Sequence, residues 1–340
     1  MNAKLVYAIL LAVLSVFIVL INSLCVNVIM TSKRLLQNPP TLLIANLIVV
    51  HLIQGLFVVP LYAIDMFYVN RWACDFYRFT SMLTFYGSCI GVALLSIDRL
   101  LAIKMLTSYH LTVTKTRVIK LIIFSWIYVG GLCLIPFVPL KMAKPILLTK
   151  QCSYNQPKIW SILMLVINAF LIYLFVVFSY VLIRRKLIKI CVFLNKLTIN
   201  NQYVASIKST KSINFSKTTL LVLWLVLCYA ITWAPTIIYL LVQHFELAPS
   251  FFNEKFYKSN IGEILTFFVK YVNFIDAIIA PIIYCFNHQE FQLKLKAKVR
   301  KLSKKKKKNC IASESDIDLK NISLSTIAQS CNASTNSVLQ

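Results

Sequence analysis

The sequence predicts an all-α membrane protein: a bundle of seven transmembrane helices followed by a short amphipathic helix on the cytoplasmic side. Of the 340 residues, 59% are hydrophobic and only 14% are charged, whereas soluble domains usually carry about 25% charged residues. The apolar residues also gather in seven runs, each long enough for a membrane-spanning helix, which needs about 20 residues. These two observations favour lipid over water as the solvent of the fold.

Each run is predicted to be a helix, because lipid offers no partners for the backbone N–H and C=O groups. Strands are excluded, since the runs are too long and lack alternating polarity. The predicted helices cover residues 5–30, 41–64, 76–101, 118–140, 159–183, 218–242 and 264–286, so that the bundle occupies residues 1–286. The first run could be a secretion signal, but it exceeds the usual length of about 7–15 apolar residues and ends in no cleavage site. It is therefore interpreted as a retained helix.

The distribution of basic residues predicts the orientation. Most of the 36 Lys and Arg residues lie in the tail and in the loops after helices one, three and five. Connections rich in Lys and Arg remain cytoplasmic, which places the carboxyl terminus inside the cell and the amino terminus outside. The expected location is the plasma membrane. Because topology accounts for the net charge of +25, no nucleic-acid partner is expected.

The segment after helix seven is predicted to follow the inner membrane face. Residues 287–302 combine apolar and basic side chains in the manner of an amphipathic helix. The run Lys304–Lys308 then favours contact with anionic lipid of the inner leaflet, with a solvated charge run as the alternative. The rest of the tail, within residues 303–340, is rich in Ser, Thr and Asn and is predicted to be disordered. Its hydroxyl groups are candidate phosphate acceptors.

Two of the ten cysteines are predicted to face the outside of the cell. Cys74 stands at the outer start of helix three, and Cys152 lies in the loop before helix five. Two cysteines in an oxidising compartment favour a disulfide bond. Two unpaired thiols are the alternative.

Polar and proline residues inside the predicted helices point to function, because such residues are costly in a membrane. Helix three ends with Asp98-Arg99-Leu100, and helix six contains Thr232-Trp233-Ala234-Pro235, with Tyr229 one turn before Trp233. Helix seven contains Ala280-Pro281-Ile282-Ile283-Tyr284. Proline removes a backbone hydrogen bond and kinks a helix, so helices six and seven are predicted to bend.

In this order and spacing, the motifs resemble those of rhodopsin-like (class A) G-protein-coupled receptors, over about residues 5–300. Asp98-Arg99-Leu100 is similar to D-R-Y, the Trp233 segment to C-W-x-P, and the Pro281 segment to N-P-x-x-Y. Further matches are Asn22 of helix one, Trp126 and Pro136 of helix four and Tyr180 of helix five, whereas Ile172 replaces the usual proline of helix five. No subfamily is assigned.

The resemblance implies a G-protein coupling switch made of Asp98, Arg99, Tyr180 and Tyr284. It also implies that Trp233 lies under a ligand pocket and acts, with Tyr229, Pro235 and Pro281, on the movement of helix six. Cys74 precedes Arg99 by 25 residues, the separation usual for this family. The implied partners are a heterotrimeric G protein, an extracellular ligand, and arrestin and receptor kinases that act on the Ser/Thr-rich tail.

The largest departure from the family lies in the polar core, for which Asn22, His51, Ser88 and Asp276 are the candidate residues. The family has an aspartate where helix two has His51, and an asparagine where helix seven has Ala280. In the family these two residues and a helix-three serine, here Ser88, help to hold a sodium ion. We hypothesise that His51 and Asp276 pair across helices two and seven in place of that ion. Two separately satisfied polar residues are the alternative.

The ligand is poorly specified, with Ser81, Trp233 and Lys270 as candidate pocket residues. Receptors for biogenic amines usually carry an aspartate where Ser81 stands, so a cationic amine lacks its expected partner. Lys270 could bind a carboxylate or phosphate, or could extend outward to the membrane surface. No lysine occupies the position near Phe274 at which opsins attach retinal, so retinal is not expected.

The sequence therefore predicts a ligand-operated receptor that is not an enzyme and needs no cofactor or metal ion. No Gly-rich phosphate loop or HExxH pattern occurs. A receptor-like protein that no longer signals is an alternative, because Leu100, His51, Ala280 and Thr232 alter the family motifs. A transporter or channel is a further alternative, although the inverted repeats typical of transporters are absent from the sequence.

Overall fold

The computed structural model of the chain describes residues 3–68, 70–105, 108–137, 158–200, 205–245, 256, 259–287, 291–297 and 300. The chain divides into two units, Met1–Gln289 and Glu290–Gln340, and each is described by itself. In the second unit, residues 291–297 are helical, within the predicted amphipathic segment. Cys152, residues 138–140 of the predicted fourth helix and the tail from residue 301 lie outside the described residues.

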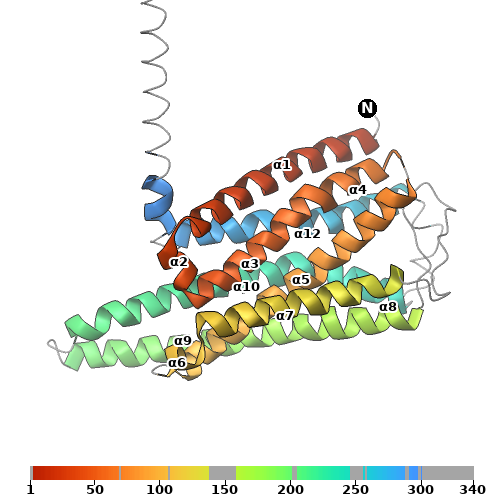
Figure 1. The fold of residues 1–340 in the computed structure, drawn as a ribbon. Helices are drawn as coiled ribbons and strands as arrows, with labels where there is room; N and C mark the ends of the chain where they lie inside the picture. Colours follow the sequence, from red (N-terminus) through yellow and green to blue (C-terminus); the bar gives the residue numbers. More distant parts are fainter. Residues whose placement is uncertain are drawn as a thin grey trace, which may run out of the picture. The chain divides into compact units, whose positions relative to one another are not determined.

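The first unit is a bundle of long helices joined by short ones (Figure 1). Seven described segments are long and apolar enough to cross a membrane, so the prediction of a seven-helix membrane bundle is confirmed. The long elements are α1 (Ala3–Met30), α3 (Pro39–Ile53) with η1 (Gln54–Val58) and α4 (Val59–Asp65), α5 (Arg71–Lys104), α7 (Lys115–Leu134) with η2 (Ile135–Phe137), α8 (Lys158–Leu165) with η3 (Val166–Phe170) and α9 (Leu171–Asn200), α10 (Ala205–Phe245) and α12 (Asn260–Asn287). The connections contain α2 (Lys33–Gln37) and α6 (Tyr109–Thr112).

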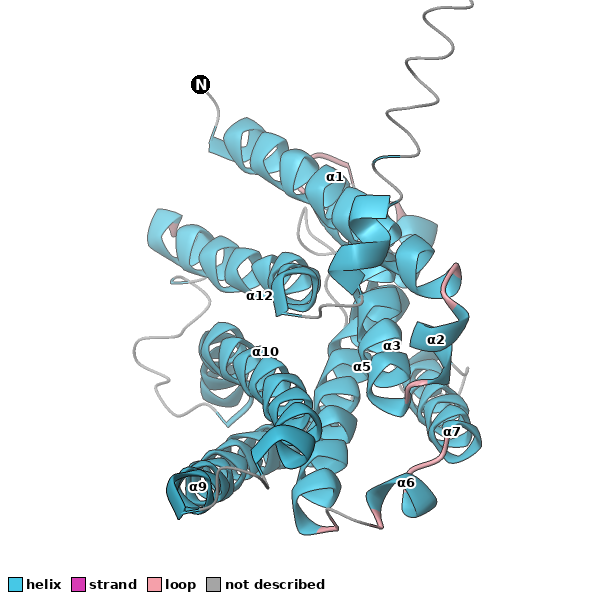
Figure 2. Ribbon diagram, turned by 90° about the vertical axis from the view of Figure 1, so that its left-hand side faces the viewer, coloured by secondary structure: helices cyan, strands magenta, loops and turns pink. Residues whose placement is uncertain are grey.

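The helix α5 is the centre of the bundle. It packs against α3, α7, α9 and α10, as the view in Figure 2 shows. The helix α1 packs against α3, α4 and α12, and α12 packs in turn against α10. Residues of α5, α10 and α12 can therefore meet inside the bundle.

Two helices extend much further than the apolar runs predicted. Residues 184–217 are predicted to form the longest connection, with helical extensions at its flanks, Arg184–Lys186 and Lys208–Lys217. In the structure α9 continues to Asn200 and α10 begins at Ala205. This stretch contains neither glycine nor proline, so nothing in it interrupts a helix. Hydropathy marks only where a helix enters the apolar region, which is why it underestimates the length of helices that continue into water.

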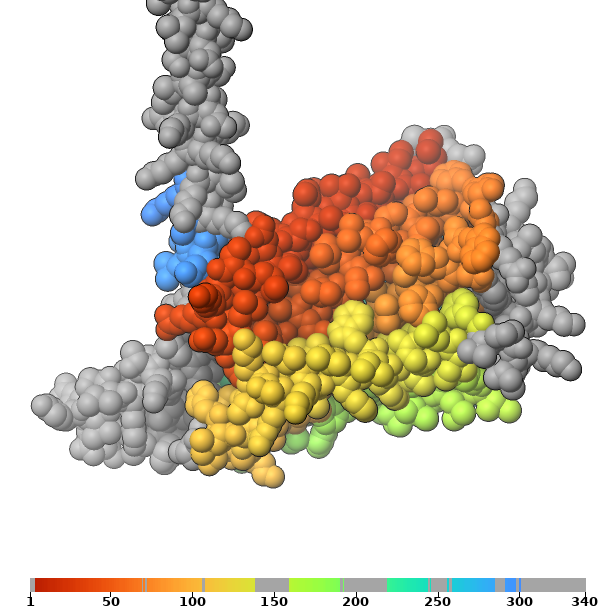
Figure 3. Space-filling view, in the orientation of Figure 1, coloured from red at the N-terminus to blue at the C-terminus, as the bar shows by residue number. Residues whose placement is uncertain are grey.

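The outer surface of α7 is apolar. Only Val118, Val129 and Cys133 of this helix are buried, whereas Phe124 and Ile127 are 67% and 69% exposed. The space-filling view shows α7 across the surface of the unit (Figure 3). Large continuous apolar surfaces are rare on soluble monomers, so this surface fits contact with lipid.

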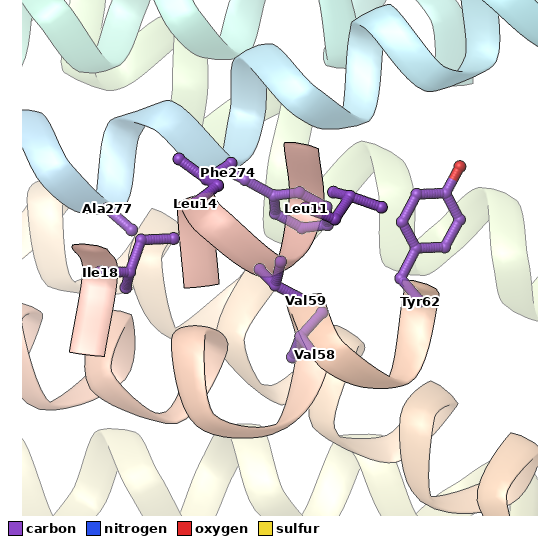
Figure 4. Packing of buried hydrophobic residues seen from close by; sticks show 8 residues of the cluster. All are labelled: Leu11, Leu14, Ile18, Val58, Val59, Tyr62, Phe274 and Ala277. Carbon is purple, nitrogen blue, oxygen red and sulfur yellow. The ribbon is translucent and has the colours of Figure 1, made fainter. Parts of the chain in front are cut away.

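A buried apolar cluster joins four elements at the α1 side of the bundle (Figure 4). It contains Leu11, Leu14 and Ile18 of α1, Val58, Val59 and Tyr62 of η1 and α4, and Phe274 and Ala277 of α12. Burying a side chain of this size contributes about 1.5–3 kcal/mol in water. In a membrane, close packing replaces this hydrophobic term as the source of stability.

The helix α1 packs closely against the π-helical turn η1 at Gly55. The turn precedes Pro60, which lacks an N–H group and disturbs the preceding turn. The backbone carbonyl of Gly55 accepts a hydrogen bond of 2.8 Å from the hydroxyl of Ser15. A Cβ atom at position 55 would lie 2.5 Å from Cγ2 of Ile18, so only glycine fits there.

We expect Gly55→Ala to lower the thermal stability of the protein. The added methyl group must displace α1 or Ile18, and overpacking of this kind costs about 1–3 kcal/mol. The matched control is Gly130→Ala in α7, where a Cβ atom meets nothing within 4 Å and alanine favours the helix by roughly 0.5–1 kcal/mol. The measurement is the melting temperature of each variant in detergent. If Gly55→Ala melted at the same temperature as Gly130→Ala, the close packing of α1 on Gly55 would not matter for stability.

Candidate functional site

At one end of α5, three side chains form a buried polar cluster, the Arg99 cluster, consisting of Asp98, Arg99 and Tyr109. Asp98 and Arg99 are each 3% exposed. The guanidinium group of Arg99 pairs with Oδ2 of Asp98 through Nη2 and donates a hydrogen bond of 2.9 Å to it through Nε. The phenol of Tyr109 donates a hydrogen bond of 2.5 Å to Oδ1 of Asp98. Both carboxylate oxygens of Asp98 are thus engaged.

Tyr109 reaches this cluster from the connection after α5. The main chain turns back at Met105, and the short helix α6 places the phenol 3.3 Å from Nη2 of Arg99. Burial, together with the negative charge of Asp98, raises the pKa of Tyr109 well above its usual value. The phenol therefore stays protonated at physiological pH and remains a hydrogen-bond donor.

Next to this cluster, an apolar group joins α5, α9 and α10. Ile103, Ile183, Leu187 and Leu223 form its buried core, and Leu100 and Tyr180 pack against it. Leu100 therefore lies in an apolar contact that suits its side chain. Tyr180, a predicted residue of the coupling switch, lies at the edge of this group, and Tyr284 is fully buried in α12.

In the middle of the bundle, Trp233 of α10 lies within an aromatic stack. Its ring is 5.1 Å from that of Tyr229 and 4.8 Å from that of Phe85 of α5, measured between centroids. The phenol of Tyr229 donates a hydrogen bond of 3.2 Å to the sulfur atom of Cys89. Pro235 follows Trp233 within the same helix, so the stack lies where α10 has lost a backbone hydrogen bond.

Asp276 of α12 ties this stack to the neighbouring helix. Its Oδ2 accepts a hydrogen bond of 3.1 Å from the indole Nε1 of Trp233, and its Oδ1 accepts one of 3.3 Å from the hydroxyl of Thr232. Nε2 of His51, from α3, lies 3.8 Å from Oδ2, beyond hydrogen-bonding distance. The carboxylate thus joins α12 to α10 directly and lies close to a side chain of α3.

The other polar-core candidates lie at different positions. Nδ2 of Asn22 donates a hydrogen bond of 2.9 Å to the backbone carbonyl of Ala277, which links α1 to α12. The hydroxyl of Ser88 is buried without a hydrogen-bond partner. The structure therefore brings His51 and Asp276 close together. Asn22 of α1 bonds to the backbone of Ala277, the residue after Asp276 in α12.

A cavity of about 180 Å³ lies beyond Trp233, toward the opposite end of the bundle from the Arg99 cluster. All three predicted pocket residues, Ser81, Trp233 and Lys270, line it. Nζ of Lys270 lies 4.1 Å from the centroid of the Tyr62 ring, a distance typical of a cation–π contact. Lys270 therefore lines the cavity and contacts Tyr62 of α4 with its ammonium group.

The sequence matches the family described as 7 transmembrane receptor (rhodopsin family) over residues 21–284. This match covers most of the chain and the whole region that contains the clusters above. The chain belongs to the rhodopsin family of seven-transmembrane receptors. It is a multi-pass membrane protein, and the resemblance inferred from the motifs is confirmed. A comparison with curated proteins finds no match.

The residues of the polar core do not fit the sodium site of the rhodopsin family. His51 and Ala280 supply no oxygen ligand where the family has an aspartate and an asparagine. The nearby carboxylate of Asp276 already accepts hydrogen bonds at both oxygens. A hard cation prefers several oxygen ligands, so the polar core of this receptor is organised around Asp276 and its hydrogen bonds.

Several residues of this rhodopsin-family receptor were not identified from its sequence as part of the site. Tyr109 stands in a connection, where no periodic pattern predicts its position. Phe85, Thr236 and Asn273 line the cavity, and their spacing along α5, α10 and α12 relative to Ser81, Trp233 and Lys270 could have placed them on the same helix faces. Asp276 was identified, but its bonds to Trp233 and Thr232 were not foreseen.

Proposed function

We propose that the protein is a cell-surface receptor that converts the binding of an extracellular ligand into activation of a heterotrimeric G protein. The observation that carries this proposal is the Arg99 cluster. A guanidinium group buried at the end of the central helix is costly to maintain, and it is held by a carboxylate and a phenol that can release it. This arrangement suits a switch whose arginine binds a partner when the helices move apart.

The interior of the bundle supplies a physical route for such a movement. The cavity reaches Trp233, which Asp276 holds from α12. A ligand that displaces the indole would break this bond next to Pro235, where α10 bends most easily. Leu223 of α10, ten residues before Trp233, packs with α9 and α5 beside Arg99, so a change at Trp233 can alter the surface offered to a G protein.

In this proposal the Arg99 end of the bundle faces the cytoplasm, the cavity opens to the outside, and the receptor resides in the plasma membrane. The Ser/Thr-rich tail is then available to receptor kinases and arrestin, and the basic segment to anionic lipid. A disulfide between Cys74, at the start of α5, and Cys152 would hold the loop near the cavity. A receptor-like protein without signalling is the second candidate, favoured by the altered residues Leu100, His51, Ala280 and Thr232.

The first experiment compares ligand-free activation of a panel of Gα types by the wild type and by Arg99→Ala, at matched surface expression. We expect a basal signal with at least one Gα type, and its loss in Arg99→Ala because the side chain that binds the G protein is missing. Thr112→Ala, a change in the α6 connection outside the Arg99 cluster, serves as the control and should keep the signal. A basal signal that survives Arg99→Ala would contradict the proposed role of this residue.

A further inference from the structure

The cavity beyond Trp233 presents hydrogen-bond donors and a positive charge on one wall. Lys270 and Asn273 stand three residues apart on α12, and side chains at this spacing lie on the same helix face. Thr236 lines the cavity from α10, one turn beyond Trp233. None of the residues that line the cavity in the described part of the chain is acidic.

Two polar atoms on these residues are buried without a hydrogen-bond partner. They are Nδ2 of Asn273 and the hydroxyl oxygen of Thr236. Asn273 is only 9% exposed. A buried donor without a partner costs about 1–3 kcal/mol. Because both residues line the cavity, a polar group bound there could satisfy them.

Lys270 is likewise incompletely neutralised. In the described part of the chain its ammonium group lies over Tyr62 and forms no ion pair within 4 Å, and Asp65 acts on it only from a greater distance. An ammonium group inside a membrane protein requires a counter-charge. Among the described residues, the cavity thus offers one positive charge and at least one unused donor, but no negative charge.

The remaining lining is apolar and aromatic. Phe85, Trp233 and Phe274 form walls suited to a flat or apolar body. A single water needs about 10–15 Å³ by the same measure of volume, so a cavity of about 180 Å³ accommodates a molecule with on the order of ten non-hydrogen atoms.

From these features we infer that the cavity binds a small organic anion, with a carboxylate or phosphate group received by Lys270 and Asn273 and an apolar body packed on Trp233. The inference rests on the proposed function, since it names the class of ligand for that receptor. Charge-assisted hydrogen bonds are roughly twice as strong as neutral ones, so Lys270 supplies most of the selection for the anion. The apolar body contacts Trp233. A bound anion can therefore displace the indole ring and weaken its hydrogen bond to Asp276.

Thermal unfolding of the purified receptor in lipid nanodiscs tests this inference without a G protein. The probes are phenylacetate and indole-3-acetate, their neutral amides at equal concentration, and benzylphosphonate for the phosphate class. We expect one of the anions to raise the melting temperature by mass action, and the matching amide to have no such effect. The apparent affinity should fall at least about tenfold in Lys270→Gln and should be largely retained in Lys270→Arg.

The control for charge removal is Lys120→Gln, which changes an exposed lysine of α7 outside the cavity and should leave the anion effect intact. Without any probe, Lys270→Gln should unfold at the same or a higher temperature than the wild type, because it removes a buried cation that has no ion-pair partner among the described residues, and this gain offsets the lost contact with the Tyr62 ring. A lower melting temperature without probe would show that Lys270 is a structural residue and would overturn the inference. Equal stabilisation by the anions and their amides would overturn it as well.

These outcomes are distinct from failure of the proposed function. A receptor that binds anions through Lys270 but shows no Arg99-dependent signal would keep the ligand class and lose the coupling. A receptor with an Arg99-dependent basal signal but no preference for anions would lose the ligand class alone.

Discussion

Asp98→Asn is expected to raise ligand-independent G-protein activation about tenfold. The substitution keeps the size of the side chain but removes the charge that holds the Arg99 guanidinium group in the buried cluster. Breaking one partner of a buried ion pair is strongly unfavourable for the state that contains it. A loss of about 1.4 kcal/mol from the resting state alone shifts a two-state equilibrium tenfold.

Tyr109→Phe should act in the same direction with a smaller effect. It removes the phenol that donates to Asp98 at 2.5 Å and leaves the Asp98–Arg99 pair in place. One hydrogen bond of this kind contributes about 0.5–1.5 kcal/mol, which predicts an increase of roughly two- to tenfold. Basal nucleotide exchange measured at matched expression would contradict the restraining role of the cluster if Asp98→Asn were no more active than the wild type.

Asp276→Leu is expected to cause a large loss of thermal stability. The indole N–H of Trp233 loses its acceptor on α12, and an unsatisfied buried donor costs about 1–3 kcal/mol. The hydroxyl of Thr232 loses only its contact with Asp276 and keeps the backbone carbonyl of Cys228, at 2.9 Å, as its acceptor. Asp276→Asn is the conservative comparison, because an amide oxygen can still accept the indole hydrogen bond. The asparagine variant should therefore unfold close to the wild-type temperature.

A double-mutant cycle with Trp233→Phe isolates the contact between these two residues. Phenylalanine has no N–H group, so removing the carboxylate should cost less stability in the Trp233→Phe background than in the wild type. Thermal unfolding of the four proteins in nanodiscs provides the measurement. If Asp276→Leu cost the same in both backgrounds, the indole–carboxylate bond would have no role in holding α10 to α12.

The seven spans could be predicted from the sequence because lipid imposes a strong and simple requirement on apolar length. Their internal irregularities could not. The π-helical turn in η3 occurs without the proline usual for helix five, and it contains Asn168, whose Oδ1 accepts a hydrogen bond of 2.7 Å from the phenol of Tyr128. This hydrogen bond joins α7 to η3 and depends on how the two helices pack. The residue pattern within one helix does not predict such packing.

Contacts within the site, too, could be predicted from the sequence only in part. The pairing of Asp98 with Arg99 was expected from the resemblance to the D-R-Y motif of the family. Tyr109 joins them only because the chain turns back through α6. The pairing of His51 with Asp276 was a hypothesis, made because Asp276 lies one turn from Ala280 on a similar face of helix seven. The donors that occupy Asp276 became visible only when α10 and α12 were placed side by side.

We propose that Asp98 and Tyr109 restrain Arg99, and that the released Arg99 acts on the G protein. Guanine-nucleotide exchange by purified receptor in nanodiscs tests it most directly, with Asp98→Asn compared with the double variant Asp98→Asn/Arg99→Ala on the Gα type that gives the strongest basal signal. We expect elevated exchange in the single variant and none above background in the double variant, because the arginine that Asp98→Asn releases is then absent. Equal exchange by both variants would contradict this proposal.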